Sequence, residues 1–141
     1  MKTTLVMLLL TLGTLCAGQT AKPRQATLAQ QKMCAEQAQK IFKEDNPTRP
    51  EHAITWEYTS HYEPRTNVCY IMTHTATVKD KGFSISYAVY DAIEGRGYAS
   101  FIQIDKDVME CDITRPGQDE EQCHSSDEFR TLVEKYFGVG Q

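Results

Sequence analysis

Four cysteines are the residues with the most readily assigned chemistry. Cys34, Cys69, Cys111 and Cys123 follow an N-terminal segment that is typical of exported proteins. In an oxidising compartment an even number of cysteines usually forms disulfides, and four cysteines allow three connectivities. No two of them are closer than twelve positions. Structural zinc sites use ligand pairs only a few residues apart, so the sequence predicts no metal site and no cofactor.

The most suggestive polar cluster is Ser60-His61-Tyr62, which is followed by Glu63. A histidine can act as a general base or contact a ligand at neutral pH, so His61 and Tyr62 are candidate binding residues. Strand periodicity places His61 on the outward face beside a turn, where a structural hydrogen bond is the alternative interpretation. The sequence contains no nucleophile elbow, Ser-x-x-Lys pair or phosphate-binding loop, and no catalytic residue is assigned.

Acidic residues form a third candidate group. Asp119, Glu120 and Glu121 lie in a polar segment between two cysteines and could present a negative surface to a cationic partner. A charged loop that keeps the protein soluble is the simpler interpretation. The chain carries 15 Lys and Arg against 19 Asp and Glu, for a net charge of -4. An acidic chain without a basic cluster lacks the electrostatic pattern of a nucleic-acid binder and disfavours an anionic membrane surface.

The N-terminal segment predicts export. Lys2 precedes an apolar run from Leu5 to Leu12, and small residues end at Gly18. This pattern is typical of a cleavable signal peptide over residues 1–18. The run is shorter than the roughly 20 residues that span a bilayer, so no stable membrane span is predicted. A lipid anchor on Cys16 is the rival interpretation. The expected location is periplasmic or secreted.

A single α+β domain is expected over residues 27–141, after a flexible tail over residues 19–26. Thr27 and Gln30 form a capping box, so a helix should begin there and continue to about Asp45. A second amphipathic helix, capped by Ser125, should end at Gly138. The two helices are expected to cover the apolar face of one sheet.

The segment between the helices has the period of two that is typical of strands. Short turns separate its apolar runs, which favours a four- to five-stranded antiparallel meander over crossover units. The expected strands occupy about 53–62, 68–78, 83–89, 98–105 and 108–113.

These elements favour one disulfide pairing over the other two. Cys34 falls on the apolar face of the first helix and Cys69 on the second strand, so a bridge between them would join helix to sheet. Cys111 and Cys123 bracket the acidic segment, and a bridge between them would close it. We therefore predict these two pairs.

Several short stretches together resemble a group of small secreted bacterial proteins of unknown function. The similarity would cover about residues 34–137, and the proteins of this group carry Asn where this chain has Glu63. The resemblance implies a bacterial exported domain and no particular activity. It rests on Cys34-Ala35-Glu36-Gln37-Ala38, Ser60-His61-Tyr62, Cys69-Tyr70, Tyr90-Asp91-Ala92-Ile93-Glu94-Gly95, Tyr98-Ala99-Ser100-Phe101-Ile102 and Ser126-Asp127-Glu128-Phe129.

Two functions remain open at this point. The leading expectation is a non-enzymatic exported domain that binds a protein or envelope partner, of which inhibition of a cationic hydrolase such as a lysozyme is one form. It rests on a disulfide-stapled acidic scaffold and on the lack of a complete catalytic set. The alternative is a small-ligand-binding protein or hydrolytic enzyme with a cleft around His61. The sequence assigns neither the partner nor the oligomeric state.

Overall fold

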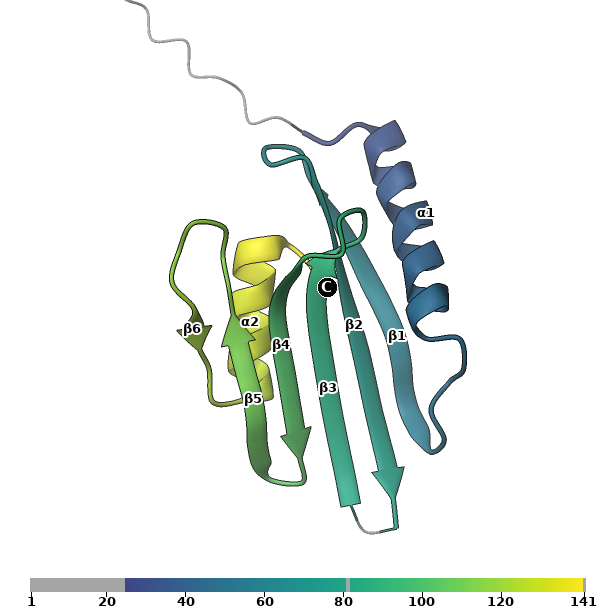
Figure 1. Cartoon of the computed structure of the whole chain (residues 1–141), viewed down its shortest axis with the longest axis vertical. Helices are drawn as coiled ribbons and strands as arrows, with labels where there is room; N and C mark the ends of the chain where they lie inside the picture. The colour runs from purple at the N-terminus through teal and green to yellow at the C-terminus, as the bar shows by residue number, and fades with distance from the viewer. Residues whose placement is uncertain (1–24, 81, 141) are drawn as a thin grey trace, which may run out of the picture.

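The computed structural model describes residues 25–80 and 82–140. The predicted signal peptide, residues 1–18, and most of the predicted tail lie outside the described residues. Two helices and a six-stranded antiparallel sheet confirm the α+β class (Figure 1). The elements are α1 (Leu28–Asp45), β1 (Ala53–Glu63), β2 (Val68–Lys79), β3 (Gly82–Asp91), β4 (Gly97–Ile104), β5 (Asp107–Ile113), β6 (Glu121–Gln122) and α2 (Ser126–Phe137).

The sheet is a meander in which each strand pairs with the next one along the chain, in the order β1-β2-β3-β4-β5-β6. The sheet therefore has one strand more than the four to five that were expected, and the additional strand is β6. The Cys111–Cys123 disulfide holds the chain beside β5 here, and the Cys123 N–H donates to the Cys111 carbonyl at 3.1 Å. A two-residue strand formed next to a covalent link has no periodicity from which it could be predicted.

Local capping fixes where α1 begins. The Thr27 Oγ1 accepts a hydrogen bond from the Gln30 N–H at 3.2 Å, and the Gln30 Oε1 accepts one from the Thr27 N–H at 2.9 Å. This reciprocal capping box satisfies two backbone donors that the first helical turn leaves without partners. The predicted start and end of the first helix are confirmed. Its buried residues are Cys34, Ala38 and Phe42.

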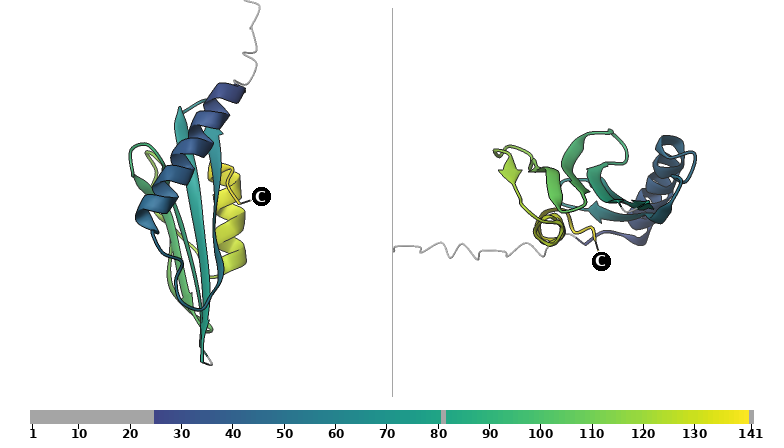
Figure 2. Two further views of the ribbon diagram at one scale, coloured as in Figure 1. Left: turned by 90° about the vertical axis from the view of Figure 1, so that its right-hand side faces the viewer. Right: turned by 90° about the horizontal axis from the view of Figure 1, so that it is seen from below.

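The two helices lie on opposite faces of the sheet, which corrects the expectation of one covered face (Figure 2). The reason is visible in β2. Cys69 and Ile71 belong to the buried cluster beneath α1, whereas Tyr70 and Met72 belong to the cluster beneath α2. Because alternate residues of a strand point to opposite faces, four consecutive buried residues require cover on both sides. We name these sides the α1 face and the α2 face.

Aromatic rings dominate both cores. On the α1 face, Phe42 packs against Trp56 and Tyr58, with ring centroids 5.0 and 4.8 Å apart. Burial and the Asp45 carboxylate raise the pKa of Tyr90, at the border of this cluster, to about 12. The α2 face holds the larger cluster. Its largest fully buried side chains are Phe101, Phe129, Ile113, Val89, Val133 and Val139.

Both predicted disulfides are confirmed. Cys34–Cys69 joins α1 to β2, with a Cα–Cα distance of 5.4 Å, and Cys111–Cys123 closes the segment after β5, with a Cα–Cα distance of 5.1 Å. Both distances lie in the ordinary range for disulfides. All four residues are buried within the two clusters. Each disulfide therefore stabilises one of the two cores.

Removing either disulfide is expected to destabilise the fold. Replacement of Cys34 and Cys69 by alanine opens a loop of 35 residues, and replacement of Cys111 and Cys123 opens one of 12. The chain-entropy model gives losses in the free energy of unfolding of about 4 and about 3 kcal/mol. Urea unfolding of each double variant beside the unchanged protein measures both losses. A loss of less than about 1 kcal/mol for either pair would contradict this role.

Candidate functional site

His61 lies on the α2 face of β1 and packs beneath the end of α2. Gly138, the C-cap of that helix, has a left-handed backbone with φ of 67°. A Cβ atom at position 138 would lie 3.1 Å from the Cδ2 and Nε2 atoms of His61. The glycine therefore serves two needs, the positive φ and the close approach of the imidazole ring. The end of α2 therefore covers the face of β1 on which His61 lies.

Tyr62 points to the opposite face and is buried in the α1 cluster. Its hydroxyl donates to the Asn67 side chain and accepts a hydrogen bond from the Gln30 Nε2 at 2.9 Å. The tyrosine thus connects the first turn of α1 to the turn between β1 and β2. His61 and Tyr62 are adjacent in sequence, but the structure does not bring their side chains together.

A groove with a volume of about 720 Å³ follows the end of β1 beside α1. Gln31 and Ala35 line it from the helix, and residues 60–63 line it from the strand. Arg65 also lines the groove, and its Nε lies 3.0 Å from the Glu63 Oε1. This hydrogen bond to Arg65 holds the pKa of the Glu63 carboxyl below its ordinary value. The groove therefore carries a carboxylate that stays ionised, paired with a guanidinium.

The backbone of β1 is open along this groove. The Val78 N–H of β2 donates to the His52 carbonyl on the β1 side, whereas the Cys69 carbonyl accepts from the β3 side. The N–H and C=O of one residue in an antiparallel strand point the same way, and this direction alternates along the strand. The even-numbered residues of β2 therefore direct their backbone groups to β1. Their partners in the register, as in Thr59↔Met72 and His61↔Tyr70, are the odd-numbered residues of β1, which bond to β2.

The alternate residues of β1 point away from β2. Because β1 is the first strand in the sheet order and pairs only with β2, no strand of the described residues takes up these groups. Proteins commonly protect such an edge with charged side chains or prolines. Glu57, Glu63 and Pro64 flank the segment from Tyr58 to Tyr62, which itself contains no Asp, Glu, Lys, Arg or Pro. The residues with outward-pointing backbone groups are Tyr58, Ser60 and Tyr62.

The acidic segment lies at the other edge of the sheet, beside β6. The Glu121 Oε2 accepts a hydrogen bond from the Tyr136 hydroxyl at 3.0 Å and lies 3.4 Å from the Arg115 guanidinium. Arg115 also stacks over the Tyr136 ring, 4.3 Å from its centroid. Glu120 accepts from the Gln122 amide at 2.9 Å, and Asp119 is exposed. Glu121 thus fixes the segment to α2.

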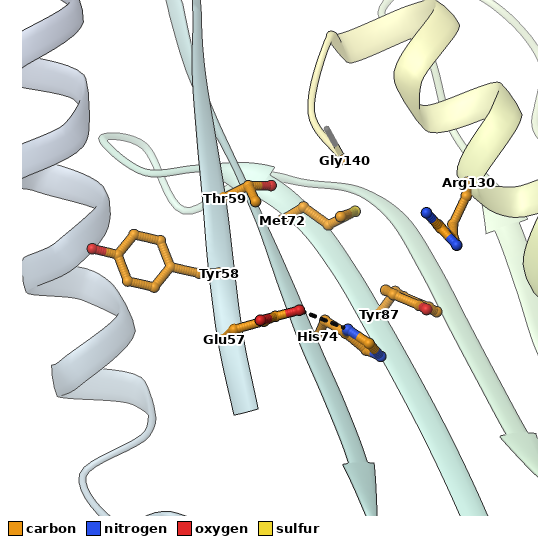
Figure 3. Close-up of a pocket in the computed structure, with 8 residues that line it drawn as sticks. All are labelled: Glu57, Tyr58, Thr59, Met72, His74, Tyr87, Arg130 and Gly140. Atoms are coloured by element: carbon orange, nitrogen blue, oxygen red, sulfur yellow. Dashed lines mark hydrogen bonds and ion pairs between the residues drawn. The ribbon is translucent and has the colours of Figure 1, made fainter. Parts of the chain in front are cut away.

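A pocket of about 280 Å³, which we name the α2 pocket, lies between α2 and the first three strands (Figure 3). Glu57 and His74 meet there, with 3.2 Å between Oε1 and Nδ1. The His74 ring stacks on Tyr87 at 4.3 Å between centroids. Met72 and Thr59 also line the pocket from the sheet, and Arg130 lines it from α2. The pocket therefore combines both charge signs with an aromatic and aliphatic floor.

The α2 pocket escaped the sequence prediction for a specific reason. Strand alternation places His74 on the same face of β2 as Tyr70 and Met72. It does not reveal the register that sets His74 opposite Glu57 on one side and Tyr87 on the other. The contribution of Arg130 depends on which face α2 covers. The only signal of this pocket in the sequence was that alternation places its strand residues on one face of each strand.

Comparison with known proteins adds no assignment, since no family model, curated protein or solved structure shows a significant match. Within residues 25–80 and 82–140, no helix has the length and apolarity that crossing a membrane requires. In the same residues no group of three or more His, Cys, Asp or Glu side chains could hold a metal ion.

Because His61 packs beneath Gly138, an alanine at position 138 should cost more stability than an alanine at Gly95, which has no such neighbour. Gly138→Ala should lower the free energy of unfolding by about 2 to 3 kcal/mol, because alanine costs about 1 to 2 kcal/mol at positive φ and its Cβ also displaces His61. Gly95 is the matched control, because it has a φ of 69° and no atom lies within 4 Å of the position that a Cβ would take there. Gly95→Ala should show the backbone cost alone.

Urea unfolding of both variants measures this difference. Adding His61→Ala to each glycine variant isolates the contribution of the ring, and the two costs should then converge. Equal costs for the two single variants would contradict the packing role of His61.

Proposed function

We propose that this protein is an exported, non-enzymatic domain that binds an extended segment of a partner protein by adding a strand to β1. The observation that carries the proposal is the row of outward-pointing backbone groups at Tyr58, Ser60 and Tyr62, beside the groove that α1 forms with β1. Main-chain hydrogen bonds supply affinity in such complexes, and pockets for alternate side chains supply specificity. The Cys34–Cys69 disulfide joins α1 to β2, the strand that pairs with β1, and so holds the helix beside this edge.

A partner protein fits this edge better than a second copy of the chain. An antiparallel pair of β1 strands centred on Ser60 would place Glu57 of each copy opposite Glu63 of the other. Like charges directly opposite each other destabilise a strand pair. The same two carboxylates would attract an added strand with basic residues at the facing positions. The partner is therefore expected to present a cationic extended segment.

Electrostatics of the whole chain supports a cationic partner. The net charge of -4 would speed the approach of a basic protein, and salt would screen that attraction. Exposed carboxylates contribute little individually, so the main effect of salt should fall on the association rate. A cationic hydrolase remains one concrete form of partner, now with β1 rather than residues 119–121 as the contact.

The geometry around His61 favours binding over hydrolysis. A catalytic histidine has to reach both substrate and nucleophile. His61 lies against Gly138 on one face, while Tyr62 is hydrogen bonded to Gln30 and Asn67 on the other. These contacts hold the His61 and Tyr62 side chains on opposite faces of β1, so the two do not act together, although both residues line the groove beside α1.

A proline at the centre of the edge tests the proposal. Ser60→Pro removes an outward N–H, so it should abolish capture of the partner by the mature protein from the exporting cell's envelope fraction. Stability should change little, because no hydrogen bond to β2 is lost. Ser60→Ala is the matched control, because it keeps the N–H and should capture the same protein as the unchanged chain. Quantitative mass spectrometry of the captured fractions measures the difference.

Capture of one cationic protein by the unchanged chain and by Ser60→Ala, with at least about a tenfold loss in Ser60→Pro, supports strand addition. Equal capture by all three proteins would place the contact elsewhere and contradict it. Thermal unfolding of Ser60→Pro confirms that any loss comes from the edge and not from misfolding.

A further inference from the structure

We propose that the α2 pocket binds a small zwitterion of the amino-acid class, a ligand site separate from the edge of β1. The pocket presents opposite charges on opposite walls. Figure 3 shows Glu57 on β1 at one side and Arg130 on α2 at the other, with the side chains of β2 and β3 between them. A ligand with a carboxylate and an ammonium group would satisfy both walls.

Arg130 supplies the anion-binding wall. Its guanidinium lines the pocket and forms no ion pair with any residue in the described part of the chain. Three other arginines do have such partners: Arg65 pairs with Glu63, Arg96 with Glu94 and Arg115 with Glu121. A guanidinium binds a carboxylate through two parallel hydrogen bonds, which fix orientation as well as position. Arg130 is thus available for the carboxylate of a ligand.

Glu57 supplies the cation-binding wall, and His74 orients it. An ionised carboxylate only accepts hydrogen bonds, so the proton of their 3.2 Å contact lies on the His74 Nδ1. The contact uses the Oε1 of Glu57 and leaves the Oε2 for an ammonium group. His74 cannot swing away easily, because its ring stacks on Tyr87 with an interplanar angle of 19°.

Tyr87 and Met72 form the apolar part of the floor between the two walls. Tyr87 stacks in turn on Phe129 of α2, with 5.6 Å between centroids, so the rings connect the sheet to the helix. Met72 adds a flexible thioether that can adjust to the shape of an aliphatic side chain. This surface suits the side chain of an apolar amino acid. Its volume of about 280 Å³ fits a ligand of amino-acid or dipeptide size.

Thr59 adds a polar group without a partner. Its Oγ1 is buried and forms no hydrogen bond within the described residues, although the residue lines the pocket. Because this oxygen has almost no accessible surface, a ligand oxygen or nitrogen would reach it only after the Thr59 side chain turns toward the pocket, and it would then recover part of the free-energy cost of the unpartnered hydroxyl.

The pocket and the open edge can be occupied together. Glu57 and Thr59 direct their backbone groups to β2, and the outward groups belong to the alternate residues of β1. An added strand would lie beside β1, whereas the ligand would lie over its α2 face. Glu57 takes part in both proposals, whereas Ser60→Pro alters only the edge and Arg130→Gln alters only the pocket, so these two variants separate the two activities.

Calorimetric titration with three probes tests the charge requirement. L-leucine carries both charges, L-leucinamide lacks the carboxylate, and N-acetyl-L-leucine lacks the ammonium. L-leucine should bind with the highest affinity, and each blocked probe should bind about fivefold more weakly, as expected for partly exposed ion pairs. The dipeptide L-leucyl-L-leucine distinguishes a free amino acid from a peptide as the ligand, depending on which binds more tightly.

Two variants assign the charges to residues. Arg130→Gln should remove the preference for L-leucine over L-leucinamide, and Glu57→Gln should remove the preference over N-acetyl-L-leucine. Arg96→Gln, on the turn after β3, is the matched control and should leave all affinities unchanged. The altered side chains are exposed, so the variants should fold, and thermal unfolding checks this.

Three results would overturn the proposal. They are the absence of L-leucine and dipeptide binding at millimolar concentration, equal affinity for the three leucine probes, and unchanged selectivity in both charge variants. The Ser60→Pro variant should bind L-leucine normally. Failure of strand addition with retained leucine binding, or the reverse, therefore separates this inference from the proposed function.

Discussion

Burial of β2 on both faces is the constraint on which the rest of the structure depends. Cys69, Tyr70, Ile71 and Met72 are consecutive, and each has an exposed fraction of 6% or less. A strand with such a run cannot lie on the surface of a one-sided sheet, because half of its apolar side chains would face water. The two helices therefore have to lie on opposite faces, and each core receives every second residue of the same strand.

This arrangement determines what is left open. The α1 helix covers the face of β1 and β2, and α2 covers the other face from β2 towards β5. Within the described residues, neither helix forms a hydrogen bond to the outward backbone groups of β1, and the groove between α1 and β1 runs beside them. The same offset of the helices creates the α2 pocket, because α2 reaches β1 only with its C-cap beside His61 and leaves Glu57 and Thr59 of β1 lining an open pocket. Both proposed sites follow from two-sided burial.

Sequence periodicity predicted the elements and their order well, because each depends on local chemistry. The capping box at Thr27, the C-cap at Gly138 and the alternation along β3 need no knowledge of the rest of the chain. The disulfides were also predictable, since Cys34 and Cys69 fall on surfaces that must meet. Alternation says which residues share a face, but it does not say how many faces are covered. The apolar run from Cys69 to Met72 was the available signal for two.

The candidate sites were predictable only in part, because they depend on register and helix placement. The parity of His61 and Tyr62 predicted that their side chains point in opposite directions, but the helix terminus over His61 followed from tertiary packing. Glu57 and His74 are 17 positions apart, and only the β1–β2 register sets them side by side. The register in turn depends on the turn at residues 64–67, whose length fixes which residues pair.

The open edge of β1 is the central claim, and amide hydrogen exchange in the free protein tests it most directly. The amides of Tyr58 and Ser60 point outward and should exchange at least about tenfold faster than those of Thr59 and His61, which donate to β2. This alternation should appear within a single strand of otherwise uniform burial. Equal protection of all four amides would mean that the edge is already paired or covered, and it would contradict the account.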